Sequence, residues 1–257
     1  MKYARRSPPR RHKAKVQEPV NLSVGEVLAG RYTLQREIGS GGYAVVWEAQ
    51  DQVLDRHVAI KVLSIRSRSS ERTAAKIERF KHEATVSAQL DHPNIITIHD
   101  MGFASATRPF IVMELLDGHD WRAELTKNGP LPAERIIHLS KAALRGLAQA
   151  HSLGVVHKDL KPENIFLVNP GSPREEVRLL DFGLASLKAN RASNITESGQ
   201  VAGTARYMAP EYLKDHDLSP AIDVYQMGLI LLEMLTGAPA NHGLPDEDVQ
   251  EPEALVG

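Results

Sequence analysis

Cysteine is absent from this 257-residue chain, which excludes disulfide bonds, thiolate zinc sites and cysteine nucleophiles. Long apolar runs are absent too. The longest, Met227 to Leu235, contains Glu233 and is far shorter than the roughly 20 residues that a membrane-spanning helix needs. No internal repeat of the solenoid type is found. We therefore expect a cytoplasmic protein, and leave open a membrane anchor beyond Gly257 in a longer gene product.

Negative charge is missing from the first residues of the chain. Residues 1–15 contain seven lysines and arginines and no carboxylate, so the net charge of −1 for the whole chain leaves −8 for the remainder. A basic arm can contact nucleic acid or an anionic membrane. Because Pro8 and Pro9 break any helix, we interpret residues 1–26 as a basic disordered leader and expect no nucleic-acid partner. No apolar segment follows it, unlike in a secretory signal.

The composition is that of a globular domain, with 42% hydrophobic and 25% charged residues. The length suits one large domain or two lobes that share a cleft. Up to residue 116, β-branched and aromatic residues around a glycine turn predict strands, and a stretch rich in Ala, Lys and Glu predicts a helix. The predicted strands are 32–38, 45–49, 58–63, 95–99 and 109–115, and the predicted helix is 71–90.

From residue 117 the pattern is mainly helical. One helix begins near Leu131 with apolar residues on one face, and Gly154 ends it. A second, 223–235, is apolar on most sides and is predicted to be central. Two short strands, 164–168 and 177–180, lie between them. Residues 184–208 form a predicted long loop, which in a compact domain is usually functional or disordered, and 241–257 are interpreted as an acidic tail.

The turn Gly39-Ser40-Gly41-Gly42 lies between two predicted strands, where backbone N–H groups can approach phosphate oxygens. A plain structural hairpin is the alternative. Lys61 lies on the next predicted strand, where its ammonium group can pair with two phosphates. The alternative interpretation is a surface lysine that packs its aliphatic chain on the protein and keeps its charge in water. A cation on the buried side of a strand needs a carboxylate, and Glu83 on the predicted helix is the expected partner.

The segment His157-Lys158-Asp159-Leu160-Lys161-Pro162-Glu163-Asn164 gives the strongest signal. Asp159 can accept a hydroxyl proton, Lys161 can neutralise charge on a transferred phosphate, and Asn164 offers an oxygen to Mg²⁺. A charged surface loop is the alternative, but the apolar segments on both sides place this one between buried strands. Asp181-Phe182-Gly183 adds a carboxylate at the end of an apolar strand, where it can hold a hard cation.

In this order, the motifs resemble those of Hanks-type protein kinases, and among them the bacterial serine/threonine kinases. The resemblance covers residues 32–237. It implies an α+β, two-lobed fold: an N-lobe sheet with one main helix (27–116) and a partial, mainly helical C-lobe (117–240) with its activation segment at 181–211. It also implies an ATP- and Mg²⁺-dependent enzyme that phosphorylates Ser/Thr hydroxyls of proteins, itself included.

The resemblance assigns roles to the motif positions. Catalytic residues would be Asp159 as base, Lys161 as charge stabiliser, and Lys61 paired with Glu83. Asn164 and Asp181 would bind the metal, and Asp223 would anchor the catalytic loop (residues 157–164). Thr196 and Ser198 are candidate phosphorylation sites. With Met113 as gatekeeper, the nucleotide would be held by Ile38, Gly39, Ser40, Gly41, Gly42, Tyr43, Ala44, Val45, Val46, Ala59, Lys61, Glu114, Leu116 and Phe166.

Three features depart from the family pattern. Ala44 replaces the third glycine of the turn, with little expected effect. Lys158 stands where the family usually has an arginine. That arginine binds an activation-loop phosphate through two parallel hydrogen bonds, whereas a lysine offers only a point charge. The helices that follow 223–235 in relatives are missing, which would remove the arginine partner of Glu211 and leave an apolar helix face uncovered.

These departures keep two alternative functions open. One is an incomplete or degenerate kinase that binds nucleotide or a partner without turnover. The other is a small-molecule kinase of related fold, which the Lys161–Asn164 run and the Ala209-Pro210-Glu211 segment disfavour.

Overall fold

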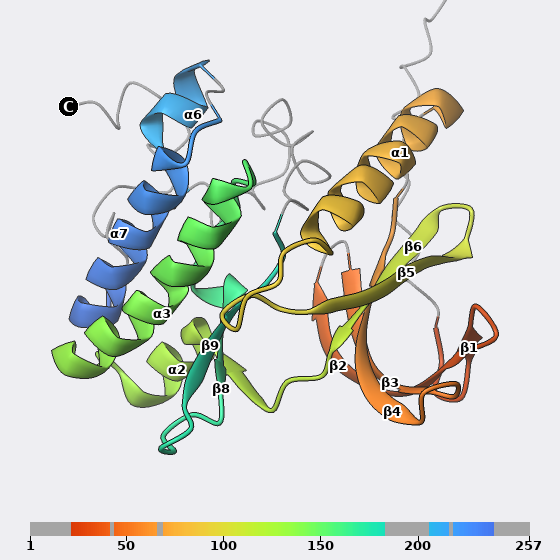
Figure 1. Ribbon diagram of the computed structural model, residues 1–257, viewed down its shortest axis with the longest axis horizontal. Helices are drawn as coiled ribbons and strands as arrows, with labels where there is room; N and C mark the ends of the chain where they lie inside the picture. The colour runs from red at the N-terminus through yellow and green to blue at the C-terminus, as the bar shows by residue number, and fades with distance from the viewer. Residues whose placement is uncertain (1–21, 42–43, 66–68, 183–205, 216–217, 239–257) are drawn as a thin grey trace, which may run out of the picture.

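The structure, a computed structural model, describes residues 22–41, 44–65, 69–182, 206–215 and 218–238. Figure 1 shows a sheet-rich part built from the first half of these residues and a mainly helical part built from the second. The chain passes between them at residues 115–117. This arrangement confirms the predicted α+β fold with an N-lobe and a C-lobe.

The N-lobe is built on an antiparallel sheet of six strands in the order β1-β2-β3-β4-β6-β5. Strand β4 lies inside the sheet, and its consecutive residues Val58, Ala59 and Ile60 are all buried, because both faces of the strand are covered. The strands are β1 (Val27–Leu28), β2 (Tyr32–Gly41), β3 (Ala44–Asp51), β4 (Arg56–Leu63), β5 (Ile98–Ser105) and β6 (Arg108–Glu114).

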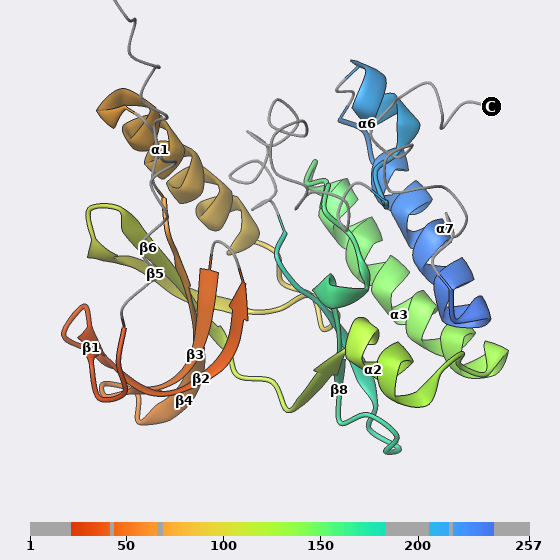
Figure 2. The ribbon, with the colours of Figure 1, turned by 180° about the vertical axis from the view of Figure 1, so that it is seen from behind.

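Helix α1 (Ser70–Ser87) packs against this sheet (Figure 2). It begins after Ser69, whose side chain accepts a hydrogen bond from the N–H of Arg72 at 3.3 Å, as N-cap serines do. Its residue Phe80 is fully buried and belongs to one apolar cluster with Ile111 of β6. The helix ends before residue 90, the predicted end, because residues 88–90 turn back onto its last carbonyls.

The C-lobe combines a three-stranded antiparallel sheet, in the order β7-β8-β9, with helices around one apolar core. The strands are β7 (Gly118–Asp120), β8 (Ile165–Val168) and β9 (Glu176–Leu179). The helices are α2 (Trp121–Asn128), α3 (Ala133–Ser152), α6 (Pro210–Asp215), α7 (Ala221–Thr236) and the 3₁₀ turn η1 (Pro162–Asn164).

Helices α3 and α7 lie side by side and run in opposite directions (Figures 1 and 2). The N–H of Leu131, just before α3, donates to the carbonyl of Met234 at 3.0 Å. At the other end, His151 contacts Asp223 at 2.7 Å. The predicted central helix is thus confirmed within the C-lobe core. Part of it stays uncovered, since Val224 and Leu232 are 59% and 46% exposed.

Some sequence predictions need correction. Strand β5 begins at Ile98, not at residue 95, and continues to Ser105, because its pairing with β6 extends that far. Strand β7 was not predicted. Leu22 packs against the N-lobe core, and the N–H of Gly25 donates to Leu34, so residues 22–26 are not a disordered leader.

Other predicted segments fall largely outside the described residues. They are the loop 184–208, of which residues 206–208 are described, the first 21 residues of the leader, and the acidic tail. Within the described ranges, no helix is long and apolar enough to cross a membrane.

Candidate active site

The hairpin of β2 and β3 carries the glycine turn. Its register pairs Gly39 with Val46 and Gly41 with Ala44. A Cβ at either glycine would meet its nearest neighbour only at 3.9 Å, and neither has a positive φ. Packing of the hairpin therefore does not require glycine at these positions, whereas close approach of a ligand to the backbone does. Gly42 and Tyr43 lie outside the described residues.

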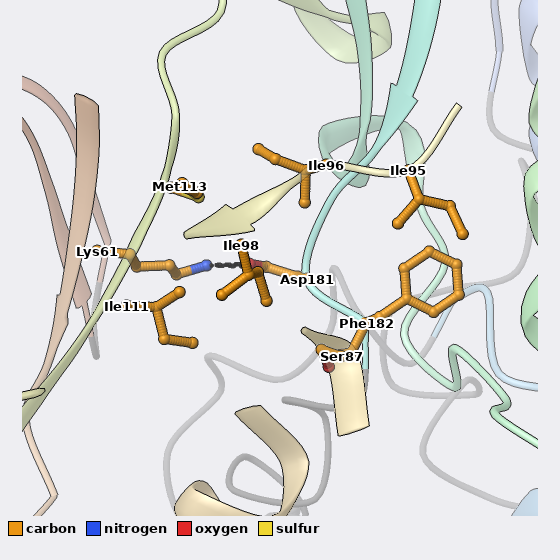
Figure 3. A pocket seen from close by; sticks show the side chains of 9 residues that line it. All are labelled: Lys61, Ser87, Ile95, Ile96, Ile98, Ile111, Met113, Asp181 and Phe182. Atoms are coloured by element: carbon orange, nitrogen blue, oxygen red, sulfur yellow. Dashed lines mark hydrogen bonds and ion pairs between the residues drawn. The ribbon is translucent and has the colours of Figure 1, made fainter. Parts of the chain in front are cut away.

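Lys61 of β4 reaches the segment that follows β9. Its Nζ donates to Oδ1 of Asp181 at 2.5 Å and also to Oδ2, and the two side chains are only 15% and 14% exposed. Figure 3 shows the two groups pointing toward each other across the space between the lobes. The structure thus brings together two predicted site residues that lie 120 positions apart.

The expected ion pair between Lys61 and Glu83 is not formed, because the carboxylate of Asp181 takes that place. Glu83 lies half-buried on α1. Burial raises its pKa to about 7, while the positive charges of Lys158 and Arg79 act in the opposite direction. Glu83 therefore lies within the field of Lys158, the residue that replaces the usual arginine of the catalytic loop.

A small cavity of about 20 Å³ is lined by side chains from both lobes, among them Met113 and the Lys61–Asp181 pair (Figure 3). This volume holds about one water molecule. The cavity lies next to Ser87, whose hydroxyl donates to the carbonyl of Phe182 at 2.9 Å. Its walls are formed by Lys61, Ser87, Ile95, Ile96, Ile98, Ile111, Met113, Asp181 and Phe182.

The residues expected around adenine belong to both lobes. Ala59 is 4% exposed and pairs with Met113 across β4 and β6. The N–H of Glu114 donates to the carbonyl of Thr97 at 3.0 Å. Phe166 lies on β8 in the C-lobe, and Leu116 lies in the connection between the lobes. These residues therefore lie on the strands and the connection where the two lobes meet, and stay candidates for the nucleotide site.

His157 ties the catalytic loop to the segment that carries Asp181. Its Nε2 lies 2.7 Å from the carbonyl oxygen of Leu180, so Nε2 must carry the proton. Its Nδ1 then accepts the N–H of Asp159 at 3.3 Å. The ring also packs on Phe182, with 4.6 Å between centroids.

Asp159 and Asn164 are buried in the same loop, at 6% and 5% exposure. The side-chain nitrogen of Asn164 donates to the carbonyl of Asp159 at 2.6 Å. The carbonyl of Asn164 accepts the N–H of Leu180 at 2.9 Å. Lys161 is half-buried at the start of η1. The predicted base and both predicted metal ligands are therefore connected through a few hydrogen bonds.

The donors available for a divalent cation are the amide oxygen of Asn164 and the carboxylate of Asp181. The amide nitrogen of Asn164 is used within the loop, which leaves its oxygen for a ligand. The described residues contain no group of three or more His, Cys, Asp or Glu that would hold a metal alone. Mg²⁺ does not need one, because it keeps several waters and shares its ligands with phosphates. The residues present fit Mg²⁺.

Two residues of α7 hold the backbone of the catalytic loop. Asp223, fully buried, accepts the N–H groups of His157 and Lys158, both at 2.8 Å. Gln226 contacts Lys158 and Leu160 and was missed by sequence reasoning. The available signal was an amide one turn after Asp223, on a helix that is apolar on most sides.

The sequence is similar to a known family and to several bacterial proteins. The protein kinase domain matches residues 32–253. The chain belongs to the protein kinase family. It is 41% identical over 218 residues to the serine/threonine-protein kinase PknA of Mycobacterium tuberculosis, covering 83% of this chain and 48% of PknA.

Other bacterial kinases are similar. PknL of Mycobacterium tuberculosis is 39% identical over 211 residues, which cover 82% of this chain and 50% of PknL. The serine/threonine-protein kinase pkn3 of Myxococcus xanthus is 37% identical over 216 residues, covering 83% and 39%. These relatives confirm the resemblance to bacterial Hanks-type serine/threonine kinases. The chain spans about half the length, or less, of these curated relatives.

Within the kinase fold, Arg122 of α2 forms a cluster that sequence reasoning also missed. Its guanidinium donates to Glu233 of α7 at 2.6 Å, to the hydroxyl of Tyr207 at 2.6 Å and to Glu163 at 3.0 Å. Tyr207 in turn donates to Glu233. Burial, and then this bond, raise the pKa of Tyr207. The cluster links the catalytic loop, α7 and the end of the activation segment.

The rest of the activation segment is described only in part. Ala209 is buried and Pro210 begins α6, while Glu211 forms no ion pair within the described ranges. Thr196 and Ser198 lie outside the described residues, so both stay candidate phosphorylation sites.

Proposed function

We propose that the chain is an ATP- and Mg²⁺-dependent protein kinase that transfers the γ-phosphoryl group of ATP to Ser/Thr hydroxyls of proteins, itself included. The observation that carries this proposal is the connection of the catalytic loop to the Asp181 segment. His157 and Asn164 both bond to Leu180, which keeps Asp159, Asn164 and Asp181 within one small region.

In the proposed reaction, the acceptor hydroxyl oxygen forms a bond to the γ-phosphorus. The bond from this phosphorus to the β–γ bridging oxygen breaks, and ADP leaves. The hydroxyl proton passes to the carboxylate of Asp159. Lys161 would stabilise charge on the transferred group.

The other residues would bind and orient the nucleotide. Asn164 and Asp181 would hold Mg²⁺, which would supply positive charge to neutralise the phosphates. Lys61 would hold the α- and β-phosphates, which requires the Lys61–Asp181 ion pair to open. The backbone of Glu114 and Leu116 would hold adenine. The acceptors would be cytoplasmic proteins.

The test is to incubate the purified chain with Mg-ATP and a generic protein substrate and to follow the mass of both. Asp159→Asn is the matched control, because it keeps the size of the side chain and removes the base. We expect a gain of phosphate that the control lacks. A folded wild-type chain that gains no more phosphate than Asp159→Asn would refute the proposal. If ATP then raised the melting temperature without transfer, a binding module would be supported instead.

A further inference from the structure

Helix α7 presents two buried polar side chains to the catalytic loop. Asp223 and Gln226 are three residues apart and therefore share one face of the helix, and both are at most 2% exposed. Asp223 accepts the N–H groups of His157 and Lys158. Its carboxylate thus holds the part of the loop that precedes Asp159.

Gln226 holds the loop on both sides of Asp159. Its Oε1 accepts the N–H of Leu160 at 3.0 Å, and its Nε2 donates to the carbonyl of Lys158 at 3.3 Å. Only one orientation of the amide satisfies both bonds, because its oxygen only accepts and its nitrogen only donates. The two groups that it binds belong to the two peptide units flanking the Cα of Asp159. One side chain therefore restrains both backbone dihedrals of that residue.

The backbone next to Asp159 needs such restraint. Lys158 has φ +71°, a left-handed conformation that is unfavourable for a residue with a side chain. Strained residues persist where their surroundings over-determine them. The N–H of Lys158 is held by Asp223 and its carbonyl by Gln226, so α7 fixes the strained residue at both ends.

Without these two hydrogen bonds, a glutamine at this buried position would be unfavourable. Burying an amide without partners costs free energy, and its neighbours Met227 and Ile230 are buried apolar residues of the core. An apolar residue at 226 would fill the same space but would leave the N–H of Leu160 without its bond. The position therefore favours a side chain that donates and accepts at once.

We propose that Gln226 is a positioning residue for phosphoryl transfer: by binding both peptide groups of Asp159, it sets the direction of the Asp159 carboxylate toward the acceptor hydroxyl. This role rests on the proposed kinase activity. It predicts a loss in the rate of transfer and not in ATP binding, because the residues proposed to contact ATP itself, Lys61 and the backbone of Glu114 and Leu116, lie on other elements.

The experiment compares Gln226→Met with Ile230→Val in the full chain. Methionine has a similar length and removes both hydrogen bonds. Ile230→Val also disturbs the buried side of α7 but leaves the loop contacts intact. The measurements are kcat, KM for Mg-ATP, melting temperature, and hydrogen exchange of the amides in 157–164. We expect Gln226→Met to lower kcat about 10- to 100-fold, as small misplacements of reacting groups do. KM should change less than about 2-fold, and exchange in 157–164 should accelerate. Ile230→Val should keep kcat and this exchange.

A folded Gln226→Met chain with unchanged kcat, or with unchanged exchange in 157–164, would overturn the proposal. So would an equal loss of kcat in Ile230→Val, which would show only general destabilisation. If the wild type transfers no phosphate, the proposed function fails, while the exchange comparison still decides whether Gln226 holds the loop. Should Gln226→Met not fold, Gln226→Asn keeps an amide but is one methylene too short for both bonds, and the same comparison applies to it.

Discussion

Removal of the Arg122 guanidinium should destabilise the fold far more than loss of a surface ion pair. In Arg122→Met, the carboxylate of Glu233, which is 1% exposed, keeps only the hydroxyl of Tyr207 as a partner among the described residues. Breaking a buried ion pair by removing one partner costs about 3–5 kcal/mol. The side chain of Arg122 is 33% exposed, so water partly replaces it, and we expect about 3 kcal/mol. At roughly 2–4 °C per kcal/mol for a domain of this size, the melting temperature falls by about 6–12 °C.

The assay is urea unfolding followed by circular dichroism, with Arg36→Met as the matched control. Arg36 forms an ion pair with Glu48 at 2.6 Å but is 70% exposed, and exposed pairs contribute about 0–1 kcal/mol. Adding Glu233→Gln to Arg122→Met should recover part of the loss, because no unpaired charge then remains buried. Equal losses for Arg122→Met and Arg36→Met, or no recovery in the double variant, would refute this reasoning.

Three further predictions concern single residues. Lys61→Met should lower phosphoryl transfer by about 10²- to 10³-fold, the usual loss when one electrostatic stabiliser is removed; radiolabelled ATP measures it, and near-normal transfer would contradict the assigned role. The pKa of Glu83 is raised from 4.5 to about 7, so its protonated form stabilises the fold below pH 4.5, and this contribution is lost as pH rises through 7. In Glu83→Gln, the unfolding free energy should therefore fall less between pH 4.5 and 7 than in the wild type, and identical slopes would argue against it. Gly118→Ala would place a methyl group 1.9 Å from the backbone oxygen of Leu167, whereas Gly171→Ala, also at positive φ, meets open space. Thermal unfolding should show a loss above about 2 kcal/mol for the first and about 1 kcal/mol for the second, and similar losses would contradict the packing argument.

The sequence predicts those parts of the fold that depend on local patterns. Alternating and β-branched residues predicted β2, β3 and β4 to within a few residues, and the apolar pattern predicted α7. The strand β7, of three residues, escaped prediction because its pairing with β8 comes from residues 166–168, far along the chain. A short strand without its own hydrophobic pattern has no local signal.

In the candidate site, too, the residues in sequence motifs were predicted, whereas contacts between distant residues were not. Asp159, Asn164 and Asp181 were predicted from motif order, and the structure connects them. The partner of Lys61 was predicted wrongly, because both Glu83 and Asp181 can supply a carboxylate and spacing along the chain does not rank them. Gln226 and Arg122 were missed because their partners are backbone groups or distant side chains, which leave no pattern in a single sequence.

In the proposed function, the ion pair of Lys61 and Asp181 would make the cation and the nucleotide interdependent ligands. Phosphates that bind Lys61 compete with the Asp181 carboxylate, and a cation that takes up this carboxylate releases the ammonium group. Each ligand would thereby raise the affinity for the other. Thermodynamic linkage requires the factor to be the same for the cation and for the nucleotide. In the proposed enzyme, the carboxylate of Asp181 would thus compete with the phosphates for Lys61 until a cation binds this carboxylate.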